Sequence, residues 1–311
     1  NTPLGITRTI LNNVKTHHEI FVVEMGADKL NDINKICKII KPNISILTGI
    51  SNQHLETFKT QENIIKTKYQ IIENLLPDGF SVFNSQSPEI SELFNKTTGT
   101  KYDVDVNNTK AFANAQNIKL SQNGCEFDGF FGEQKIHLKA KLLGEHNISN
   151  ILIAVTVALN LGMSEKEIKK AVFNLKQIKN RLEVVKLSTG AIILDDSFNS
   201  NVKGSLYALR VLNLFKDKTK IVLTPGIVEL GDESYVENFK FGKSLAEAAD
   251  TGYIVNYENK EAIFNGLKIA GFSEKNIKFY SSFGAAFNDI KHILNNNHIL
   301  LIENDLPDNY L

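Results

Sequence analysis

The sequence has little cysteine, and this shortage excludes two classes of protein. Its 311 residues include only two cysteines, Cys37 and Cys125. Two are too few for a disulfide-stapled scaffold or for a four-cysteine zinc site. Sparse, unpaired cysteine is typical of a reducing compartment, so we expect a cytoplasmic protein.

The sequence also lacks net charge and a long hydrophobic run. Lys and Arg together number 35, and Asp and Glu also number 35. Nucleic-acid-binding proteins usually carry a basic excess or a basic stripe, so we expect no nucleic-acid partner. The longest apolar stretch, Ile151–Met163, is interrupted by Asn160 and Gly162. It is too short to span a bilayer, so we expect no membrane partner.

What is present is the pattern of a globular α/β protein. Hydrophobic residues make up 42% of the chain, enough for a sizeable core. In the first third, three apolar runs rich in β-branched residues predict strands at His18–Met25, Asn43–Thr48 and Gly79–Asn84. Apolar residues at helical spacing predict helices over residues 33–40 and 61–76. Strands that alternate with helices at these lengths indicate a parallel sheet.

The rest of the chain predicts a small antiparallel portion and then a second α/β domain. Short alternating segments fill Lys101–Leu143, and two helices are expected at Asn147–Leu161 and Ser164–Leu175. We place the domain boundary so that residues 1–178 form one domain and residues 179–311 the other. The strands expected in the second domain are Ala191–Leu194, Lys220–Leu223, Gly252–Val255, Ile277–Tyr280 and His298–Ile302.

Candidate metal ligands follow two of the expected strands, where parallel sheets bind ligands. Glu24 ends the first strand, and His54 lies a few residues beyond the second. A carboxylate and an imidazole at neighbouring strand ends suit a divalent cation. The alternative is a helix-capping Glu and a surface-loop His.

Lys68 is predicted to lie on the apolar face of its helix. It falls four residues after Ile64 and four before Ile72, whereas Lys66 points away from that face. Burial lowers the pKa of an ammonium group and leaves a neutral, nucleophilic amine. Such a lysine either acts in catalysis, pairs with a carboxylate, reacts with carbon dioxide to form a carbamate, or extends its amine to the helix edge.

Two amides open the helix expected after Leu143. Asn147 and Asn150 are three residues apart and project from the first turn on neighbouring sides of one face. Each amide offers a donor and an acceptor, which suits the edge of an adenine base. Asn147 is equally suited to be an N-cap.

Asp195 and Asp196 follow an apolar strand of the second domain, and Arg181 lies at the domain boundary. Paired acids at a strand end suit a ribose hydroxyl or a metal, or cap the helix expected near Val202. The arginine either contacts a phosphate from the boundary or forms a structural ion pair.

No phosphate-binding loop of the P-loop type is found. The spacing Gly-x-x-x-x-Gly occurs at Gly226 and Gly231, but Asp232 and Glu233 follow where that loop needs Lys and Ser or Thr. Acidic side chains at that place would repel phosphate, so we reject this segment as a nucleotide loop.

Taken together and in this order, the motifs resemble those of the Mur ligase family, the ATP-dependent enzymes that form amide bonds in peptidoglycan precursors. The resemblance covers essentially the whole chain. The segments that carry it are Asn1–Gly5, Glu24–Ala27, His54–Glu56, Lys66–Lys68, Gly144–Asn150, Arg181–Glu183 and Asp195–Asn201. It implies a central ATPase domain with a parallel sheet like that of P-loop NTPases, followed by a Rossmann-like C-terminal domain.

The resemblance also implies roles for the candidate residues, with ATP and Mg²⁺ as cofactors. Glu24 and His54 match the positions that bind magnesium, and Lys68 matches a carbamylated catalytic lysine that also contacts the metal. The remaining matches are Asn147 and Asn150 to the adenine contacts, Arg181 to a catalytic phosphate contact, and Asp196 to the ribose contact.

The loop Thr224–Gly231 resembles the subgroup that adds D-alanyl-D-alanine to a UDP-N-acetylmuramoyl-tripeptide, and the resemblance implies these two partners and a monomer. The family's N-terminal domain and P-loop are expected before Asn1, so we expect a fragment that is inactive alone. Alternatives are a ligase of the folylpolyglutamate or cyanophycin type, and a non-catalytic binding module. The ending Glu303–Pro307 departs from the family pattern.

Overall fold

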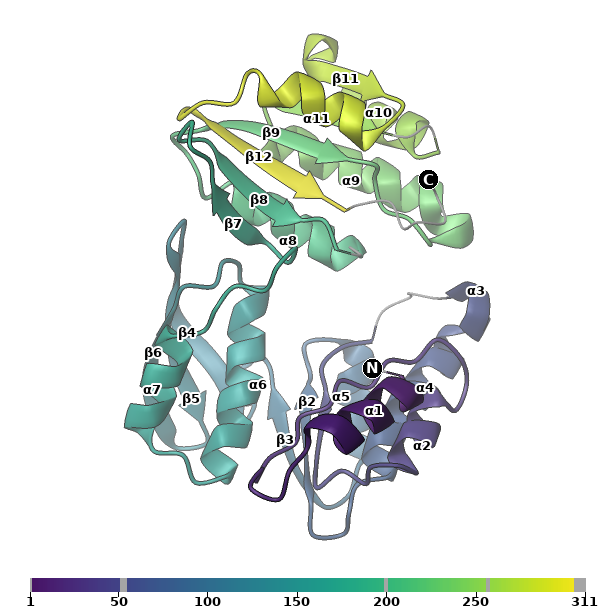
Figure 1. Ribbon diagram of the computed structural model, residues 1–311, viewed down its shortest axis with the longest axis vertical. Helices are drawn as coiled ribbons and strands as arrows, with labels where there is room; N and C mark the ends of the chain where they lie inside the picture. Colours follow the sequence, from purple (N-terminus) through teal and green to yellow (C-terminus); the bar gives the residue numbers. More distant parts are fainter. Residues whose placement is uncertain (1, 51–54, 199–200, 256–257, 305–311) are drawn as a thin grey trace. The chain divides into compact units, whose positions relative to one another are not determined.

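The computed structural model describes residues 2–50, 55–198, 201–255 and 258–304 (Figure 1). Its internal contacts divide the chain into two units, which we describe separately. The first unit comprises Asn1–Gln116, Asp128–Ile136 and Ser149–Ile168. The second comprises Asn117–Phe127, His137–Ile148 and Lys169–Leu311.

The first half of the chain contains both helices and strands, as the sequence predicts. In chain order they are α1 (Pro3–Asn13), α2 (Asp32–Cys37), β1 (Ile44–Leu47), α3 (Leu55–Phe58), α4 (Gln61–Glu73), β2 (Phe80–Asn84), α5 (Pro88–Lys96), β3 (Thr100–Val104), β4 (Ala113–Ser121), β5 (Gly124–Phe131), β6 (Gln134–Ala140), α6 (His146–Asn160) and α7 (Glu165–Phe173).

The first sheet has the strand order β1-β2-β3-β4-β5-β6. The strands β1 to β4 pair in parallel. Residues 122–123 and 132–133 are the only links between β4, β5 and β6, so these neighbouring strands form hairpins. The predicted parallel sheet with a small antiparallel portion is confirmed.

The strand predicted at His18–Met25 is wrong, because residues 19–27 form neither helix nor strand. A strand is stable only when its backbone groups bond to a neighbouring strand, and β1 pairs only with β2 among the described residues. The apolar side chains of Ile20 and Val22 are 61% and 85% exposed. The hydrophobic run therefore predicted a strand where no ladder forms.

Helix α4 forms where its apolar periodicity predicts. Its N-cap Thr60 accepts a hydrogen bond from the backbone N–H of Asn63. Its buried side chains, Ile64 among them, join a core that includes Leu47 of β1 and Phe83 of β2. This packing holds one face of α4 against the sheet.

The second unit contains the remaining elements. They are β7 (Glu183–Lys186), β8 (Ile192–Asp196), α8 (Val202–Leu212), β9 (Thr219–Thr224), η1 (Gly231–Glu233), α9 (Ser234–Ala248), β10 (Thr251–Val255), α10 (Lys260–Ile269), η2 (Glu274–Asn276), β11 (Ile277–Tyr280), α11 (Phe283–Lys291) and β12 (His298–Glu303). All five strands predicted here are present, and β7 is an addition that the sequence did not predict.

A second sheet organises this unit, in the order β11-β10-β9-β12-β8-β7. Only β7 runs antiparallel to its neighbour; the other pairs are parallel. Helices α8, α9 and α10 supply side chains to the core on one face, and α11 supplies Ala286 and Ile290 to the core on the other (Figure 1). Because helices cover both faces of the sheet, ligands can reach it only at the ends of its strands.

Within the described part of the chain, no helix is both long enough and apolar enough to cross a membrane.

Candidate functional site

A cavity of about 580 Å³ lies in the first unit and contains three of the predicted site residues. Its lining includes Glu24 from the segment of residues 22–28, Lys68 from α4 and Asn150 from α6. Residues 46–49, at the carboxyl end of β1, complete one side. The structure thus brings together groups from widely separated parts of the sequence at the end of the sheet where α/β proteins bind ligands.

Lys68 lies on the cavity side of α4, as predicted. Its side chain is half-buried, whereas Lys66, two residues earlier, is exposed. Burial lowers the pKa of the Lys68 amine because the charged form loses hydration. A larger neutral fraction favours reaction of this amine with an electrophile such as carbon dioxide.

Two carboxylates, Glu24 and Asp28, line the same cavity. Carboxylate oxygens are the protein ligands that Mg²⁺ prefers. His54, the other predicted metal ligand, lies outside the described residues. Among the residues described, no three His, Cys, Asp or Glu side chains gather into a preformed metal site.

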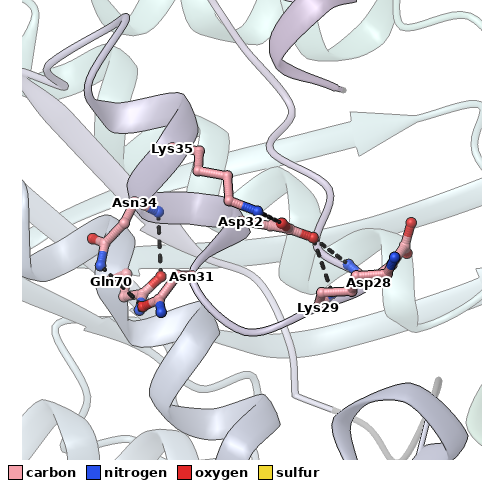
Figure 2. Close-up of polar contacts among 7 residues, drawn as sticks. All are labelled: Asp28, Lys29, Asn31, Asp32, Asn34, Lys35 and Gln70. Carbon is pink, nitrogen blue, oxygen red and sulfur yellow. Dashed lines mark hydrogen bonds and ion pairs between the residues drawn. The ribbon is translucent and has the colours of Figure 1, made fainter.

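A network of amides holds residues 31–34, which follow the cavity-lining segment, against α4 (Figure 2). The buried side chain of Gln70 donates to Asn31 Oδ1 at 2.8 Å and accepts from the backbone N–H of Asn34 at 3.2 Å. Asn31 itself has φ 66°, the left-handed region in which asparagine is favoured. Because Gln70 is two residues after Lys68, the same helix carries the lysine and anchors residues 31–34.

Asp32 ties this network to the end of the cavity-lining segment, residues 22–28. Its carboxylate accepts from the backbone N–H groups of Asp28 and Lys29, at 3.3 and 2.9 Å, and pairs with Lys35 at 2.9 Å (Figure 2). Sequence analysis missed these supporting residues. The feature of the sequence that could have indicated them is Gln70, a polar residue on the buried face of an amphipathic helix.

The second unit holds the beginning of α6 and three other predicted site residues. The helix starts at His146, so Asn147 is its second residue rather than its N-cap. The Asn147 amide donates to the carbonyl oxygen of Leu143 at 2.7 Å, whereas an N-cap side chain would accept a hydrogen bond. This excludes the capping interpretation of Asn147.

Arg181 and Asp196 lie together in this unit. The charge of Arg181 favours the ionised form of Asp196, and the guanidinium carbon lies 4.7 Å from the ring centroid of Phe198. The Asp196 carboxylate accepts from the backbone N–H of Leu182 at 3.0 Å. An exposed arginine beside a buried acid fits both alternatives for Arg181, a structural ion pair and a phosphate contact.

The backbone that presents Arg181 is strained. Asn180 and Leu182, on either side of it, have φ angles of 60° and 49°. A bulky leucine in this region is an outlier whose cost the surroundings must offset. The Asn180 side chain donates to Ser197 Oγ at 2.9 Å, and the backbone carbonyl oxygen of Asn180 accepts from the backbone N–H of Phe198 at 3.2 Å. These bonds fix Arg181 at the end of β8.

Burial, the largest cause, raises the pKa of Asp196 to about 6. The N–H of Leu182, the charge of Arg181 and the Glu303 side chain lower this pKa, and the charge of Asp195 raises it further. Glu303 is the register partner of Asp196 on the neighbouring strand β12. Sequence analysis did not predict this pairing, because strand order cannot be deduced from the spacing of motifs.

Comparisons with protein families and individual proteins show what the chain is similar to. The family model described as the Mur ligase middle domain matches residues 1–158. The chain is 26% identical over 265 residues to the UDP-N-acetylmuramoyl-tripeptide–D-alanyl-D-alanine ligase of Haemophilus influenzae, covering 85% of this chain and 57% of that protein. It is 28% identical over 297 residues to the ligase of the same name from Buchnera aphidicola subsp. Acyrthosiphon pisum, covering 95% and 60%.

Solved structures share the fold. The MurF ligase of Thermotoga maritima, determined in complex with ADP, superposes with a TM-score of 0.84 at 21% identity, covering 98% of this chain and 68% of that one. A MurF structure from Acinetobacter baumannii gives a TM-score of 0.83 at 23% identity, covering 97% and 64%. The chain spans between 53% and 60% of the length of the first curated relatives.

Proposed function

This chain belongs to the Mur ligase family, and from that premise we propose that it is the nucleotide-binding and C-terminal part of an ATP-dependent ligase that joins D-alanyl-D-alanine to a UDP-N-acetylmuramoyl-tripeptide. Relatives that carry this name cover most of the chain at 26% and 28% identity. The domain division proposed with it is residues 1–178 and 179–311.

One observation carries the proposal: Lys68, Glu24 and Asn150 line a single cavity. A half-buried lysine with a lowered pKa, beside carboxylates, suits a carbamylated lysine near a metal. Glu24, Asp28 and the carbamate of Lys68 would offer oxygen ligands of the kind Mg²⁺ takes. His54 is proposed as a further ligand. When bound, Mg²⁺ would supply positive charge that stabilises the transferring phosphoryl group.

For ATP, we assign Asn147 and Asn150 to the adenine, Asp196 to the ribose and Arg181 to a phosphate. The support is chemical: the Asn147 amide oxygen receives no hydrogen bond from the described residues, and Asn150 is exposed on the cavity lining. The guanidinium of Arg181 provides the planar donor set that binds phosphate oxygens best. The ADP in the Thermotoga maritima MurF structure supports nucleotide binding by this fold.

The reaction proceeds by two displacements. A carboxylate oxygen of the UDP-linked tripeptide attacks the γ-phosphorus of ATP, forming an acyl phosphate and releasing ADP. The amine of D-alanyl-D-alanine then attacks the acyl carbon, inorganic phosphate leaves with the carboxylate oxygen, and the proton lost by the nitrogen passes to the released phosphate. Arg181 and the Lys68 carbamate orient the reacting groups and offset charge in the transition states. We propose that the protein acts as a cytoplasmic monomer.

The test is ADP release by the full-length protein with ATP, Mg²⁺, UDP-N-acetylmuramoyl-tripeptide and D-alanyl-D-alanine, each omitted in turn. We expect continuous release only when all are present, with turnover on the usual enzymatic scale of about 1 s⁻¹ or more. Without D-alanyl-D-alanine, release should stop at one ADP per protein, and continuous release in its absence would contradict the proposed second substrate.

A further inference from the structure

The amide of Asn147 has a fixed orientation in which both of its N–H groups are used. Its nitrogen donates to the carbonyl oxygen of Leu143 at 2.7 Å and lies 3.0 Å from Nε2 of His146. A backbone carbonyl can only accept hydrogen bonds, so the nitrogen of the amide, and not its oxygen, must face Leu143. The orientation is therefore determined by chemistry rather than by convention.

This orientation assigns the tautomer of His146. Because the Asn147 nitrogen is a donor, Nε2 of His146 must accept, and the ring is neutral with its proton on Nδ1. This Nδ1 is buried and makes no hydrogen bond within the described chain, so the Asn147 contact is the one that selects the tautomer. Burial lowers the pKa of His146 to about 4, which is consistent with a neutral ring at physiological pH. The same histidine would lose its acceptor if it were protonated.

Packing fixes the position of the imidazole ring. The ring centroid lies 5.5 Å from that of Tyr207 on α8. On another side is Gly144, where a Cβ atom would come within 2.8 Å of the ring. Gly144 has φ 89°, so glycine also satisfies the backbone there. His146 is thus held where Nε2 meets the Asn147 amide.

With both N–H groups used, Asn147 has only Oδ1 to offer, and Oδ1 receives no hydrogen bond within the described chain. Resting on the proposed nucleotide site, we propose that His146 is a positioning residue that makes Asn147 an acceptor-only contact, so that the site selects a purine with a 6-amino group and rejects a 6-oxo purine.

The preference for a 6-amino purine follows from which purine groups can hydrogen-bond to Oδ1 of Asn147. An exocyclic amino group at position 6 donates to Oδ1, whereas a 6-oxo group would set two acceptors against each other. A buried polar group without a partner loses binding strength, and sites built on a specific hydrogen bond discriminate strongly against analogues that lack it. We expect ATP to bind roughly 10–100-fold more tightly than inosine triphosphate.

The experiment is calorimetric titration of the full-length protein with ATP and with inosine triphosphate, in the presence of Mg²⁺. The variants are His146→Phe, which keeps an aromatic ring but removes the acceptor, and His146→Gln, which returns an acceptor at similar reach. We expect the ATP-to-inosine-triphosphate affinity ratio to fall at least about threefold in His146→Phe and to recover in His146→Gln. A general loss of structure would weaken both nucleotides without changing their ratio.

An unchanged ratio in a folded His146→Phe protein would overturn the inference, as would equal affinities in the wild type. Should His146→Phe fail to fold, the wild type is titrated with purine riboside triphosphate, which lacks the 6-amino group. We then expect binding about tenfold weaker than that of ATP, and equal binding would overturn the inference.

The proposed function has a separate criterion. If ATP binds equally well to the wild type and to Asn147→Ala, the nucleotide site itself is wrongly assigned. If ATP binding depends on Asn147 but shows no preference over inosine triphosphate, only the role of His146 is wrong.

Discussion

Glu303 lies opposite Asp196, its register partner, at the ends of the neighbouring parallel strands β12 and β8. Asp196 is 9% exposed and Glu303 is 1% exposed, so two carboxyl groups are buried at adjacent strand ends. Two such groups avoid the repulsion of like charges when they share one proton. Burial, the largest cause, raises the pKa of Asp196 to about 6.

Replacing Glu303 by Gln should therefore raise the stability at neutral pH. The pKa of Asp196 is above its unfolded value of 3.8, so the native state holds this proton more tightly. Its contribution to stability is complete below about pH 4 and is lost as pH rises through about 6. At about 1.4 kcal/mol per pKa unit, the loss across this window is about 3 kcal/mol.

The measurement is the free energy of unfolding in urea between pH 4 and 7, for wild type and Glu303→Gln. The glutamine N–H can donate to Asp196 at any pH, so we expect a flatter profile and a gain of about 1–2 kcal/mol at pH 7. The control is Glu258→Gln, at an exposed position. Equal slopes for Glu303→Gln and wild type would refute the shared proton.

Gly144→Ala should destabilise the protein more than Gly162→Ala does. The two glycines have nearly the same φ, 89° and 85°, so both substitutions carry the backbone cost of about 1–2 kcal/mol. A Cβ at Gly162 meets nothing within 4 Å, whereas one at Gly144 meets His146 at 2.8 Å and Val211 at 3.1 Å. Crowding of this kind typically adds about 1–3 kcal/mol. Denaturant unfolding of both variants checks this, and equal losses would show that the His146 ring moves freely.

Gln70→Glu should weaken the attachment of residues 31–34 to α4. The glutamate keeps an acceptor for the Asn34 N–H but loses the donor to Asn31 Oδ1, and it sets a buried carboxylate beside that oxygen. We expect a loss of about 2–4 kcal/mol in unfolding free energy. Gln61→Glu, at the exposed first position of the same helix, is the matched control and should change stability little. Similar effects of the two substitutions on the free energy of unfolding would show that the hydrogen bonds of Gln70 to Asn31 and Asn34 do not stabilise the protein.

Lys68→Ala should abolish most of the ligase activity of the full-length protein, and small carboxylates should restore part of it by replacing the carbamate. Lys66→Ala, two residues earlier and exposed, should keep its activity. Carbon-13 NMR of protein equilibrated with labelled carbon dioxide should show a carbamate signal that is absent from Lys68→Ala. Full activity of Lys68→Ala at ambient carbon dioxide would refute the assignment.

Local periodicity predicted much of this fold, because an amphipathic helix or a buried strand is marked by its own side chains. Such patterns predicted the buried side of α4 and five of the six strands of the second sheet. The prediction for His18–Met25 was wrong because a strand also needs a partner, which local sequence does not reveal.

The site was predictable only where a residue's own position in an element indicated its environment. Lys68 was placed correctly on its helix face for this reason. The pairing of Asp196 with Glu303 depends on which strands are neighbours in the sheet, and the tautomer of His146 depends on a three-dimensional hydrogen-bond network. Neither can be read from residue spacing.

The central claim is that the tripeptide carboxylate is phosphorylated before the amide bond forms. The most direct measurement uses UDP-N-acetylmuramoyl-tripeptide whose reacting carboxylate is labelled with oxygen-18, together with ATP, Mg²⁺, D-alanyl-D-alanine and the full-length protein. Our account predicts that the released inorganic phosphate carries one labelled oxygen for each amide bond formed. Product formation with unlabelled phosphate would contradict the acyl phosphate route.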